Sequence, residues 1–370
     1  MIGTRPEAIK LAPVAHALAN RGLHPTLILT GQHPRLDPAG FGLAAFAAEL
    51  LHCPGWEDPH RHVGAVVDAI RSRLANPPDL LVVQGDTSSA LGGALAAVAR
   101  GVPVAHVEAG LRTHDPLLPW PEEEYRTAID SHADILFAPT PTAAANLASE
   151  RVRGEVHVTG NTSIDALLAV EATLPTARLR RSKLPRLLVT AHRRESWGEG
   201  LRSIAAGIHE LAAGAEIHFV LHPNSHVAAT MRDVLGGSRN IRLLEPCSHG
   251  ELIAHMRRAD LILSDSGGIQ EESPALGIPL LVLREKTERP EGIADGSAIL
   301  VGTSSERIVA EARRVLAEPT ALAQMRRRSF PYGDGKAATR IADIIADWLE
   351  RQIAAAVTNA RMSPGHPANW

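Results

Sequence analysis

The chain has 370 residues, which exceeds the roughly 250 to 300 residues at which a single hydrophobic core stops growing, so we expect two domains. Apolar residues make up 45% of the sequence, enough for a sizeable core. The net charge of -3 excludes an overall basic field for nucleic acid or an acidic membrane surface. Two distant cysteines, no span-length apolar run and no secretory hydrophobic segment favour a cytoplasmic protein.

The first half of the chain alternates short apolar runs with stretches of helical periodicity. The runs 26–29, 80–83, 102–107 and 135–138 are typical of strands, and the stretches 65–74, 90–100, 122–131 and 163–174 each have an apolar helical stripe. This alternation favours a parallel sheet with helices on both faces.

The alternation pauses at residues 175–185, which contain two prolines and a basic cluster and are typical of a linker; a basic binding patch is the alternative. It then restarts with predicted strands at 187–190, 217–221, 241–244, 261–264 and 280–283. Residues 337–355 predict a closing helix, and we expect the tail from Thr358 to Trp370 to be frayed.

The beginning of the chain is irregular for this fold class. A doubly wound domain needs a first strand before its first helix, yet the helical pattern EAIKLAPVAHALA follows only six residues. Either the first strand is missing or the true start lies upstream.

Polar motifs follow several apolar runs, where ligands bind in open α/β sheets. They read GTRPE (3–7), GDTSSA (85–90), VEAGLRT (107–113), AHRRES (191–196), HPN (222–224) and SDSGGIQEE (264–272).

The last motif opens a predicted helix, where Gly267 and Gly268 would allow backbone amides to approach a phosphate. Arg5 or Arg289 could add charge-assisted hydrogen bonds, and Glu272 could bind a ribose diol. The alternative is an ordinary helix start capped by Ser266.

Three acids, Asp86, Glu108 and Glu122, come from successive β/α units and could converge. Crowded carboxylates raise one another's pKa, which suits one to act as a general acid and another as a base. Alternatively, Asp86 caps the helix that starts at Thr87, and Glu122 is a first-turn residue after Pro121.

His192 follows a predicted strand and precedes Arg193 and Arg194, a pattern that indicates anion handling. No histidine spacing indicates a metal site, and neither GxGxxG nor GxxxxGK[ST] occurs. Chemistry through a tightly held nicotinamide is therefore disfavoured.

Taken in order, the motifs resemble the non-hydrolysing UDP-N-acetylglucosamine 2-epimerases. The resemblance rests on GTRPEAIKLAP, GDTSSA, HVEAGLRT, PWPEEEYR, GNTSIDALL, AHRRES, SDSGGIQEESPALGIPLLVLREKTERPE and PYGDGKA. The hydrolysing relatives carry GDR-type and HGGE-like segments where this chain has GDTSS and VEAG.

The resemblance implies an α/β fold with two Rossmann-like domains facing a cleft, as in GT-B glycosyltransferases. The domains would cover 1–174, with a C-terminal helix at about 340–357 packing back on it, and 182–339, which would hold the nucleotide. It also implies a homodimer, no cofactor and no metal.

The resemblance also assigns roles to residues. Asp86, Glu108 and Glu122 match the acid/base carboxylates, and His192 matches a histidine near the diphosphate. The positions that contact nucleotide or sugar are matched by Arg5, Lys10, Arg126, His222, Ser266, Gly267, Gly268, Glu272 and Arg289.

The implied reaction converts UDP-N-acetylglucosamine to UDP-N-acetylmannosamine by UDP elimination and re-addition through a 2-acetamidoglucal. The alternatives are a GT-B glycosyltransferase and a non-catalytic nucleotide-sugar binding protein.

Two segments depart from the family pattern. The stretch associated with activation by substrate reads GQHPRLDPAGF, where Pro34 and Pro38 intrude, so we do not expect such activation. The segment that usually supplies an aromatic residue beside the uracil reads EPCSHGELIAHM, which predicts altered recognition of the base.

Overall fold

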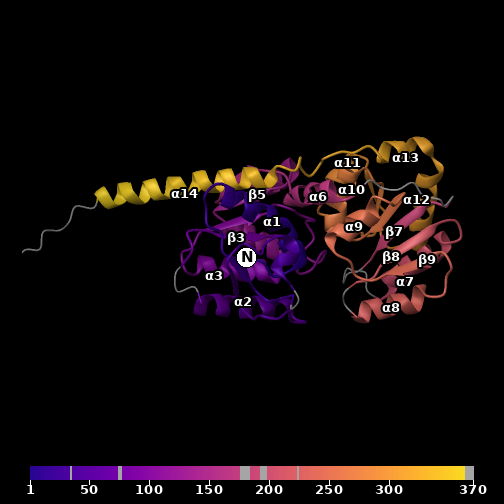
Figure 1. The fold of residues 1–370 in the computed structure, drawn as a ribbon, viewed down its shortest axis with the longest axis horizontal. Helices are drawn as coiled ribbons and strands as arrows, with labels where there is room; N and C mark the ends of the chain where they lie inside the picture. The colour runs from indigo at the N-terminus through magenta and orange to yellow at the C-terminus, as the bar shows by residue number, and fades with distance from the viewer. Residues whose placement is uncertain (34–35, 74–76, 176–183, 192–197, 223–224, 363–370) are drawn as a thin grey trace, which may run out of the picture.

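The structure is a computed structural model and describes residues 1–33, 36–73, 77–175, 184–191, 198–222 and 225–362. Most of the predicted linker at 175–185 and Pro34 lie outside these residues. The described chain is α/β with parallel sheets, as predicted, and its two halves lie side by side along the long axis (Figure 1).

The N-terminal half contains a four-stranded parallel sheet in the order β3-β4-β5-β6 and a two-stranded parallel sheet of β1 and β2. Its strands are β1 (Leu27–Leu29), β2 (Ala48–Leu50), β3 (Leu81–Gln84), β4 (Val104–Val107), β5 (Ile135–Ala138) and β6 (Glu155–Val158). Its helices are α1 (Arg5–Asn20), the 3-10 helix η1 (Pro38–Phe41), α2 (Pro59–Arg73), α3 (Ser88–Val98), α4 (Glu122–His132), α5 (Pro141–Glu150) and α6 (Thr162–Thr173).

The C-terminal half contains a six-stranded parallel sheet in the order β12-β11-β10-β7-β8-β9. Its strands are β7 (Arg186–Thr190), β8 (Glu216–Val220), β9 (Ile241–Leu244), β10 (Leu261–Ser264), β11 (Leu280–Val282) and β12 (Ala298–Leu300). Its helices are α7 (Glu199–Leu211), α8 (Ser225–Leu235), α9 (His249–Met256), α10 (Gly267–Leu276), α11 (Glu291–Ala294), α12 (Ser305–Ala317) and α13 (Pro319–Met325), and α14 (Ala337–Met362) closes the chain.

Alternation along the central strands buries both faces of the four-stranded and six-stranded sheets. In the N-terminal half, Val107 and Phe137 pack with α1 and α14, whereas Val104 and Leu136 belong to a separate core on the opposite face. Successive residues of a strand point to opposite faces, so continuous apolar runs such as Ile135–Ala138 fit a sheet covered on both sides.

The first two residues lie between β1 and β3. Ile2 forms a parallel bridge with Leu29, and the terminal ammonium group of Met1 donates to the carbonyl oxygen of Val82 at 2.7 Å. Helix α1 follows at once because Thr4 and Glu7 form a capping box at its N-terminus. This arrangement brings Arg5 and Lys10 to the same end of the N-terminal half as the ends of β3 and β4, where Cys247 and Glu271 of the C-terminal half meet them.

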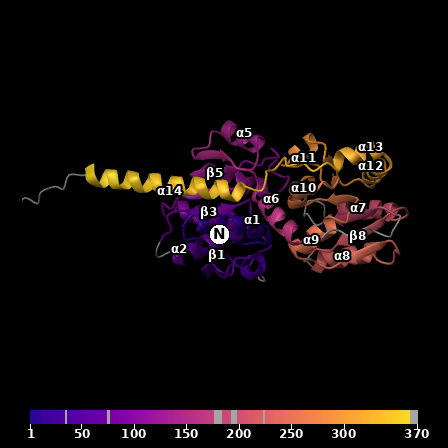
Figure 2. The ribbon, with the colours of Figure 1, turned by 45° about the horizontal axis from the view of Figure 1, so that its top comes forward.

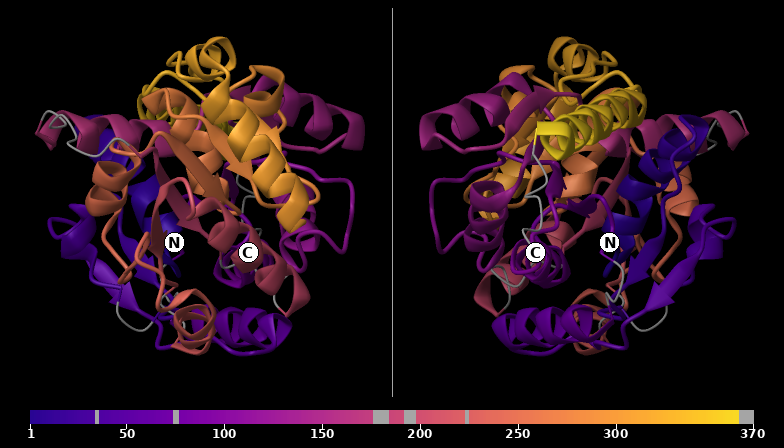
Figure 3. Two further views of the ribbon diagram at one scale, coloured as in Figure 1. Left: turned by 90° about the vertical axis from the view of Figure 1, so that its right-hand side faces the viewer. Right: turned by 90° about the vertical axis from the view of Figure 1, so that its left-hand side faces the viewer.

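Helices α6 and α14 connect the two halves. Helix α6 packs against both α9 and α10, and α14 packs against α1 and α6 (Figure 2). The far part of α14 projects beyond the N-terminal half, toward the viewer in the right panel of Figure 3. The prediction of a frayed segment directly after Thr358 is wrong up to Met362, because no glycine or proline breaks the helix before Pro364.

Among the described residues, none of the helices is long and apolar enough to cross a membrane.

Candidate active site

Two of the predicted acids follow adjacent strands of the N-terminal sheet. Asp86 lies two residues after the end of β3, and Glu108 comes directly after β4. Since parallel strands end at the same edge of a sheet, both acids lie at the edge that meets the C-terminal half. Glu108 has a φ of 70°, a left-handed conformation that costs a non-glycine residue about 1 to 3 kcal/mol and is concentrated at functional sites.

Glu108 is the centre of a buried ion network between the two halves. Its Oε2 lies 2.5 Å from Nζ of Lys10, on α1, and its Oε1 lies 2.8 Å from Nη2 of Arg289. Glu271, on α10, contacts the same two cations: its Oε2 lies 3.0 Å from Nζ of Lys10, and its Oε1 accepts from Nε of Arg289 at 2.6 Å. We call Lys10, Glu108, Glu271 and Arg289 the interdomain ion network.

Burial and charge act in opposite directions within this network. Burial raises the pKa of Glu108, against the lowering effect of Lys10. Burial would also raise the pKa of Glu271, but the charges of Lys10 and Arg289 outweigh it and lower the pKa. Burial alone would lower the pKa of Lys10, whereas Glu108 and Glu271 raise it above its ordinary value. Glu108 is therefore the carboxyl group of the network better suited to accept and return a proton.

Asp86 pairs with a second buried cation. Nη2 of Arg126, on α4, contacts Oδ2 of Asp86, and Nη1 lies 3.4 Å from Oε2 of Glu123. Within the described part of the chain, Nε and Nη1 of this buried guanidinium have no hydrogen-bond partner. Arg126 therefore combines a fixed position with spare donors, a combination that suits an anionic ligand.

Of the two structural alternatives for the acids, a helix cap for Asp86 and a first-turn position for Glu122, only the second is observed. Thr87, and not Asp86, is the N-cap of α3, where its hydroxyl accepts from the amide of Ala90. Glu122 is the first residue of α4 after Pro121, as the alternative predicts. Arg126, which pairs with Asp86, lies on the same helix as Glu122, about one turn further along.

The start of α10 lies directly against Arg289. Ser266 is the N-cap of α10 but makes no side-chain capping hydrogen bond. A Cβ added at Gly267 would lie 2.8 Å from Cζ of Arg289, whereas one added at Gly268 would meet only Oγ of Ser266 at 4.0 Å. Gly267 is therefore required by the close approach of the guanidinium, and the amides of this helix start lie beside a cation.

The remaining predicted residues lie in different places. Glu272 accepts from Nε2 of His249 at 2.6 Å, and Nη2 of Arg5 donates to the carbonyl oxygen of Cys247 at 3.0 Å, so both residues contact the segment expected beside the base. His222 lies just beyond β8, at the end of the strand. His192 lies outside the described residues.

Sequence reasoning missed a second buried network beneath the acids. Nδ1 of His106, on β4, lies 2.6 Å from Oδ1 of Asp130, and its Nε2 lies 2.8 Å from the carbonyl oxygen of Gly85. Asp130 also accepts from the amide of Gly110 at 3.1 Å and from Nη2 of Arg112 at 2.7 Å. Gly85 adjoins Asp86, and Glu108 lies between His106 and Gly110, so this network fixes the backbone that carries both acids.

One further carboxylate and an amide complete the surroundings of Glu108 and Arg289. Gln84 donates to Oε2 of Glu108 at 2.6 Å, and Glu288 accepts from Arg289 and from Nη1 of Arg284. A sign in the sequence was available for Glu271 and Glu288: each is an acid beside a predicted site residue, Glu272 or Arg289.

Comparison with known proteins places this chain in a family. The family model described as UDP-N-acetylglucosamine 2-epimerase matches residues 16–346. The UDP-N-acetylglucosamine 2-epimerase of Salmonella typhimurium is 38% identical over 368 residues, which cover 94% of this chain and 98% of the relative. This chain belongs to the UDP-N-acetylglucosamine 2-epimerase family.

Solved structures agree with this assignment. The Neisseria meningitidis UDP-GlcNAc 2-epimerase bound to UDP-GlcNAc has a TM-score of 0.88 at 35% identity and covers 93% of this chain and 98% of its own. The Methanocaldococcus jannaschii UDP-GlcNAc 2-epimerase in complex with UDP-GlcNAc and UDP has a TM-score of 0.81 at 33% identity, over 93% of this chain and 98% of its own. The predicted fold class, two Rossmann-like units of the GT-B type, is confirmed together with the family.

Proposed function

We propose that this protein interconverts UDP-N-acetylglucosamine and UDP-N-acetylmannosamine. The observation that carries the proposal is the interdomain ion network, in which Glu108 meets Lys10 and Arg289 where the two halves join. It unites a carboxylate suited to proton transfer with cations suited to a diphosphate. Relatives with 35% and 33% identity have been solved with UDP-GlcNAc, which supports this choice of substrate.

The chemistry explains why both kinds of group are needed together. The proton on C2 of the sugar is not acidic in the ground state, since C2 is not adjacent to a carbonyl group. It becomes removable as the C1–O bond to UDP stretches, because C1 then gains oxocarbenium character. The leaving diphosphate must therefore be stabilised while a base takes the C2 proton.

The proposed reaction has two balanced stages. In the first, a carboxylate accepts the C2 proton, the C2–H electron pair forms the C1–C2 double bond, and UDP leaves with the C1–O pair, which gives a 2-acetamidoglucal. In the second, a carboxyl group donates a proton to C2 from the opposite face while UDP re-adds to C1. We assign the proton transfers to Asp86, Glu108 and Glu122 as a group.

The contacts with the substrate are proposed for the residues that match the family motifs. They are Arg5, Lys10, Arg126, His222, Ser266, Gly267, Gly268, Glu272 and Arg289, together with His192 near the diphosphate. We divide the chain into domains at 1–174, joined by the C-terminal helix, and 182–339, which would hold the nucleotide. We further propose that the protein is cytoplasmic and forms a homodimer. Light scattering after gel filtration measures the mass of the particle and so tests the dimer.

Proton NMR in D₂O tests the proposed reaction. We expect deuterium at C2 and formation of the manno epimer, and a loss of exchange of about 100-fold or more in each of Asp86→Asn, Glu108→Gln and Glu122→Gln. The matched control is Glu124→Gln, because Glu124 is exposed on the same helix turn as Glu122. Absence of both deuterium and epimer in the unmodified protein would reject the proposal, and acceptor-dependent UDP release without exchange would indicate a glycosyltransferase.

A further inference from the structure

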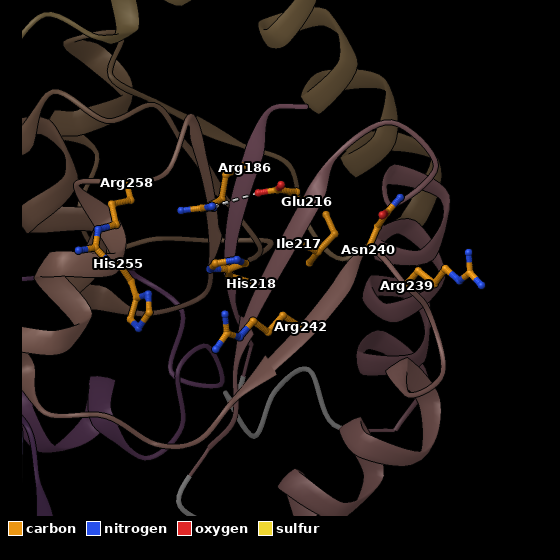
Figure 4. A pocket seen from close by; sticks show the side chains of 9 residues that line it. All are labelled: Arg186, Glu216, Ile217, His218, Arg239, Asn240, Arg242, His255 and Arg258. Carbon is orange, nitrogen blue, oxygen red and sulfur yellow. Dashed lines mark hydrogen bonds and ion pairs between the residues drawn. The ribbon is translucent and has the colours of Figure 1, made fainter. Parts of the chain in front are cut away.

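A second group of basic side chains lies on the C-terminal half. It surrounds a cavity of about 590 Å³ lined by Arg186, Glu216, Ile217, His218, Arg239, Asn240, Arg242, His255 and Arg258. Figure 4 shows Arg186, His218, Arg242, His255 and Arg258 turned toward one space, whereas Arg239 extends away from it. We call these five residues the basic pocket.

Strand register and one helix bring the five residues together. Leu188, His218 and Arg242 are aligned across β7, β8 and β9, and Arg186 precedes Leu188 by two residues on the same face. Residues two apart on a strand point to the same side, so Arg186, His218 and Arg242 share one face of the sheet. His255, near the end of α9, and Arg258, just after it, close that face from the side.

The pocket has excess positive charge. Nη2 of Arg186 is paired with Oε2 of Glu216 at 3.1 Å, but no carboxylate in the described part of the chain pairs with Arg242 or Arg258. Burial and the nearby Arg186, His255 and Arg242 lower the pKa of His218 to about 4, so its imidazole is neutral at pH 7. The pocket therefore offers two uncompensated guanidinium groups and two imidazoles that can donate hydrogen bonds.

The position of the pocket separates it from the candidate active site. Arg186 and Glu216 begin β7 and β8, whereas the candidate active site lies beyond the opposite ends of the strands, where α10 follows β10. Helix α9 spans the two regions, since His249 at its start contacts Glu272 and His255 lies six residues later, roughly 9 Å along the helix axis. An occupant of the basic pocket is thus distinct from a substrate held by Glu108 and Arg289.

The lining also restricts the class of ligand. The cavity falls within the range of about 300 to 1,000 Å³ that is usual for small-molecule sites. Guanidinium groups bind phosphate oxygens through paired hydrogen bonds, and no phenylalanine, tyrosine or tryptophan lines the cavity to stack on a base. The chain as a whole has a net charge of -3, which does not favour binding of a long polyanion such as a nucleic acid.

We propose that the basic pocket is a binding site for a small anion of the diphosphate class, separate from the substrate site. The guanidinium groups of Arg242 and Arg258 form ion pairs with the anion, and His218 and His255 donate hydrogen bonds to it. Arg186, which is already paired with Glu216, forms the rim.

Calorimetric titration with inorganic diphosphate tests the site in the full-length chain at fixed ionic strength, without UDP because its diphosphate would compete for the basic pocket. The double variant Arg242→Ser/Arg258→Ser should weaken binding by about tenfold or more, because each lost guanidinium removes charge-assisted hydrogen bonds. The control is Arg239→Ser, which removes one positive charge beside the cavity from a side chain that points away, and it is compared with Arg242→Ser alone, which removes one from the pocket. Unchanged thermal unfolding and UDP binding confirm that the variants are folded.

Three results would overturn the proposal. They are no saturable binding in the unmodified chain, equal weakening in Arg239→Ser, and equal affinity for orthophosphate. The first excludes a site, the second indicates diffuse attraction, and the third excludes the diphosphate class. The comparison between variants does not use the epimerase reaction, so its outcome is independent of the exchange assay.

Discussion

Arg289 and Glu108, which are 181 positions apart, form an ion pair of 2.8 Å that joins the two halves of the molecule. Both side chains are buried, and removal of either would leave an unpaired charge in a medium of low dielectric constant. The pair therefore links the relative position of the two halves to the protonation of the carboxyl group proposed for proton transfer.

The contact between Gly267 and Arg289 predicts a loss of activity in Gly267→Ala. The new Cβ would lie 2.8 Å from Cζ of Arg289, so the guanidinium must move away from Glu108 and Glu271. We expect the rate of C2 deuterium exchange to fall by about 10- to 100-fold, because displacements near 1 Å at a reacting centre can cost that much. Stability should fall as well, since the shift weakens the buried ion pairs of Arg289 with Glu108 and Glu271.

Gly268→Ala is the matched control for this substitution. Its Cβ would meet only Oγ of Ser266 at 4.0 Å, so we expect near-normal exchange. Equal rates in both variants would contradict the positioning role of Gly267.

The position of Lys10 predicts a change in the pH dependence of Lys10→Met. Burial raises the pKa of Glu108, and the charge of Lys10 opposes that rise. Without the ammonium group the pKa of Glu108 rises further. The limb of the pH–rate profile that Glu108 determines should therefore move to higher pH, as measured by C2 exchange from pH 5 to 10.

Lys286→Met provides the comparison for Lys10→Met. Lys286 also pairs with a carboxylate of the other half, Asp115, at 2.7 Å, but its side chain is 49% exposed. We expect the pH–rate profile of Lys286→Met to overlay that of the unmodified protein. An unchanged profile in Lys10→Met would show that the pKa of Glu108 does not determine this limb.

The network around Asp130 predicts a loss of stability and activity in Asp130→Asn. The substitution leaves the buried Arg112 without one of its two carboxylates and weakens the contact with His106. We expect a cost of about 3 to 5 kcal/mol in the free energy of unfolding, the usual range for breaking a buried ion pair. Exchange should also slow, because the backbone that carries Asp86 and Glu108 loses its support.

The stability cost of Asp130→Asn should depend on pH. Burial would raise the pKa of Asp130, but His106 and Arg112 lower it below the ordinary 3.8. A carboxyl group with a lowered pKa in the folded state stabilises the protein above its unfolded pKa, and this stability is lost as the pH falls through the folded value. Urea unfolding should therefore show the full difference at pH 7 and a smaller one below about pH 4.

The comparison variant is Glu150→Gln, which removes the other carboxylate of Arg112. It should lower the free energy of unfolding by only about 0 to 1 kcal/mol, since Glu150 is partly exposed.

The hydroxyl of Tyr332 predicts a moderate loss of stability in Tyr332→Phe. This buried hydroxyl donates to the carbonyl oxygen of Arg289 at 3.0 Å and accepts from the amide of Gly292 at 2.9 Å. Its removal leaves the amide without that partner and should cost about 1 to 3 kcal/mol in urea unfolding. Tyr125→Phe should cost less, because the hydroxyl of Tyr125 makes a longer contact, 3.3 Å, with His60.

The local sequence pattern was sufficient to predict the bounds of a strand where that strand is regular and largely apolar. The runs at 135–138, 241–244 and 261–264 are strands with the predicted bounds. The first and the last consist of four consecutive apolar or small residues, which fit a strand buried on both faces, whereas 241–244 includes the exposed Arg242. Strand β6, with the sequence EVHV, was missed since its polar residues give no such signal. Its existence depends on pairing with β5, which no local pattern reveals.

The sequence by itself determined the fold class, the family and the residues that follow the strands, because strand and helix periodicity and motif spacing are local properties of the chain. Only the tertiary structure decided which charges meet. Lys10, Glu108, Glu271 and Arg289 lie on four separate segments, and His106 and Asp130 form a support that no motif indicated. Burial and distance determine the pKa of a carboxyl group, and both are set by packing between segments far apart in the chain.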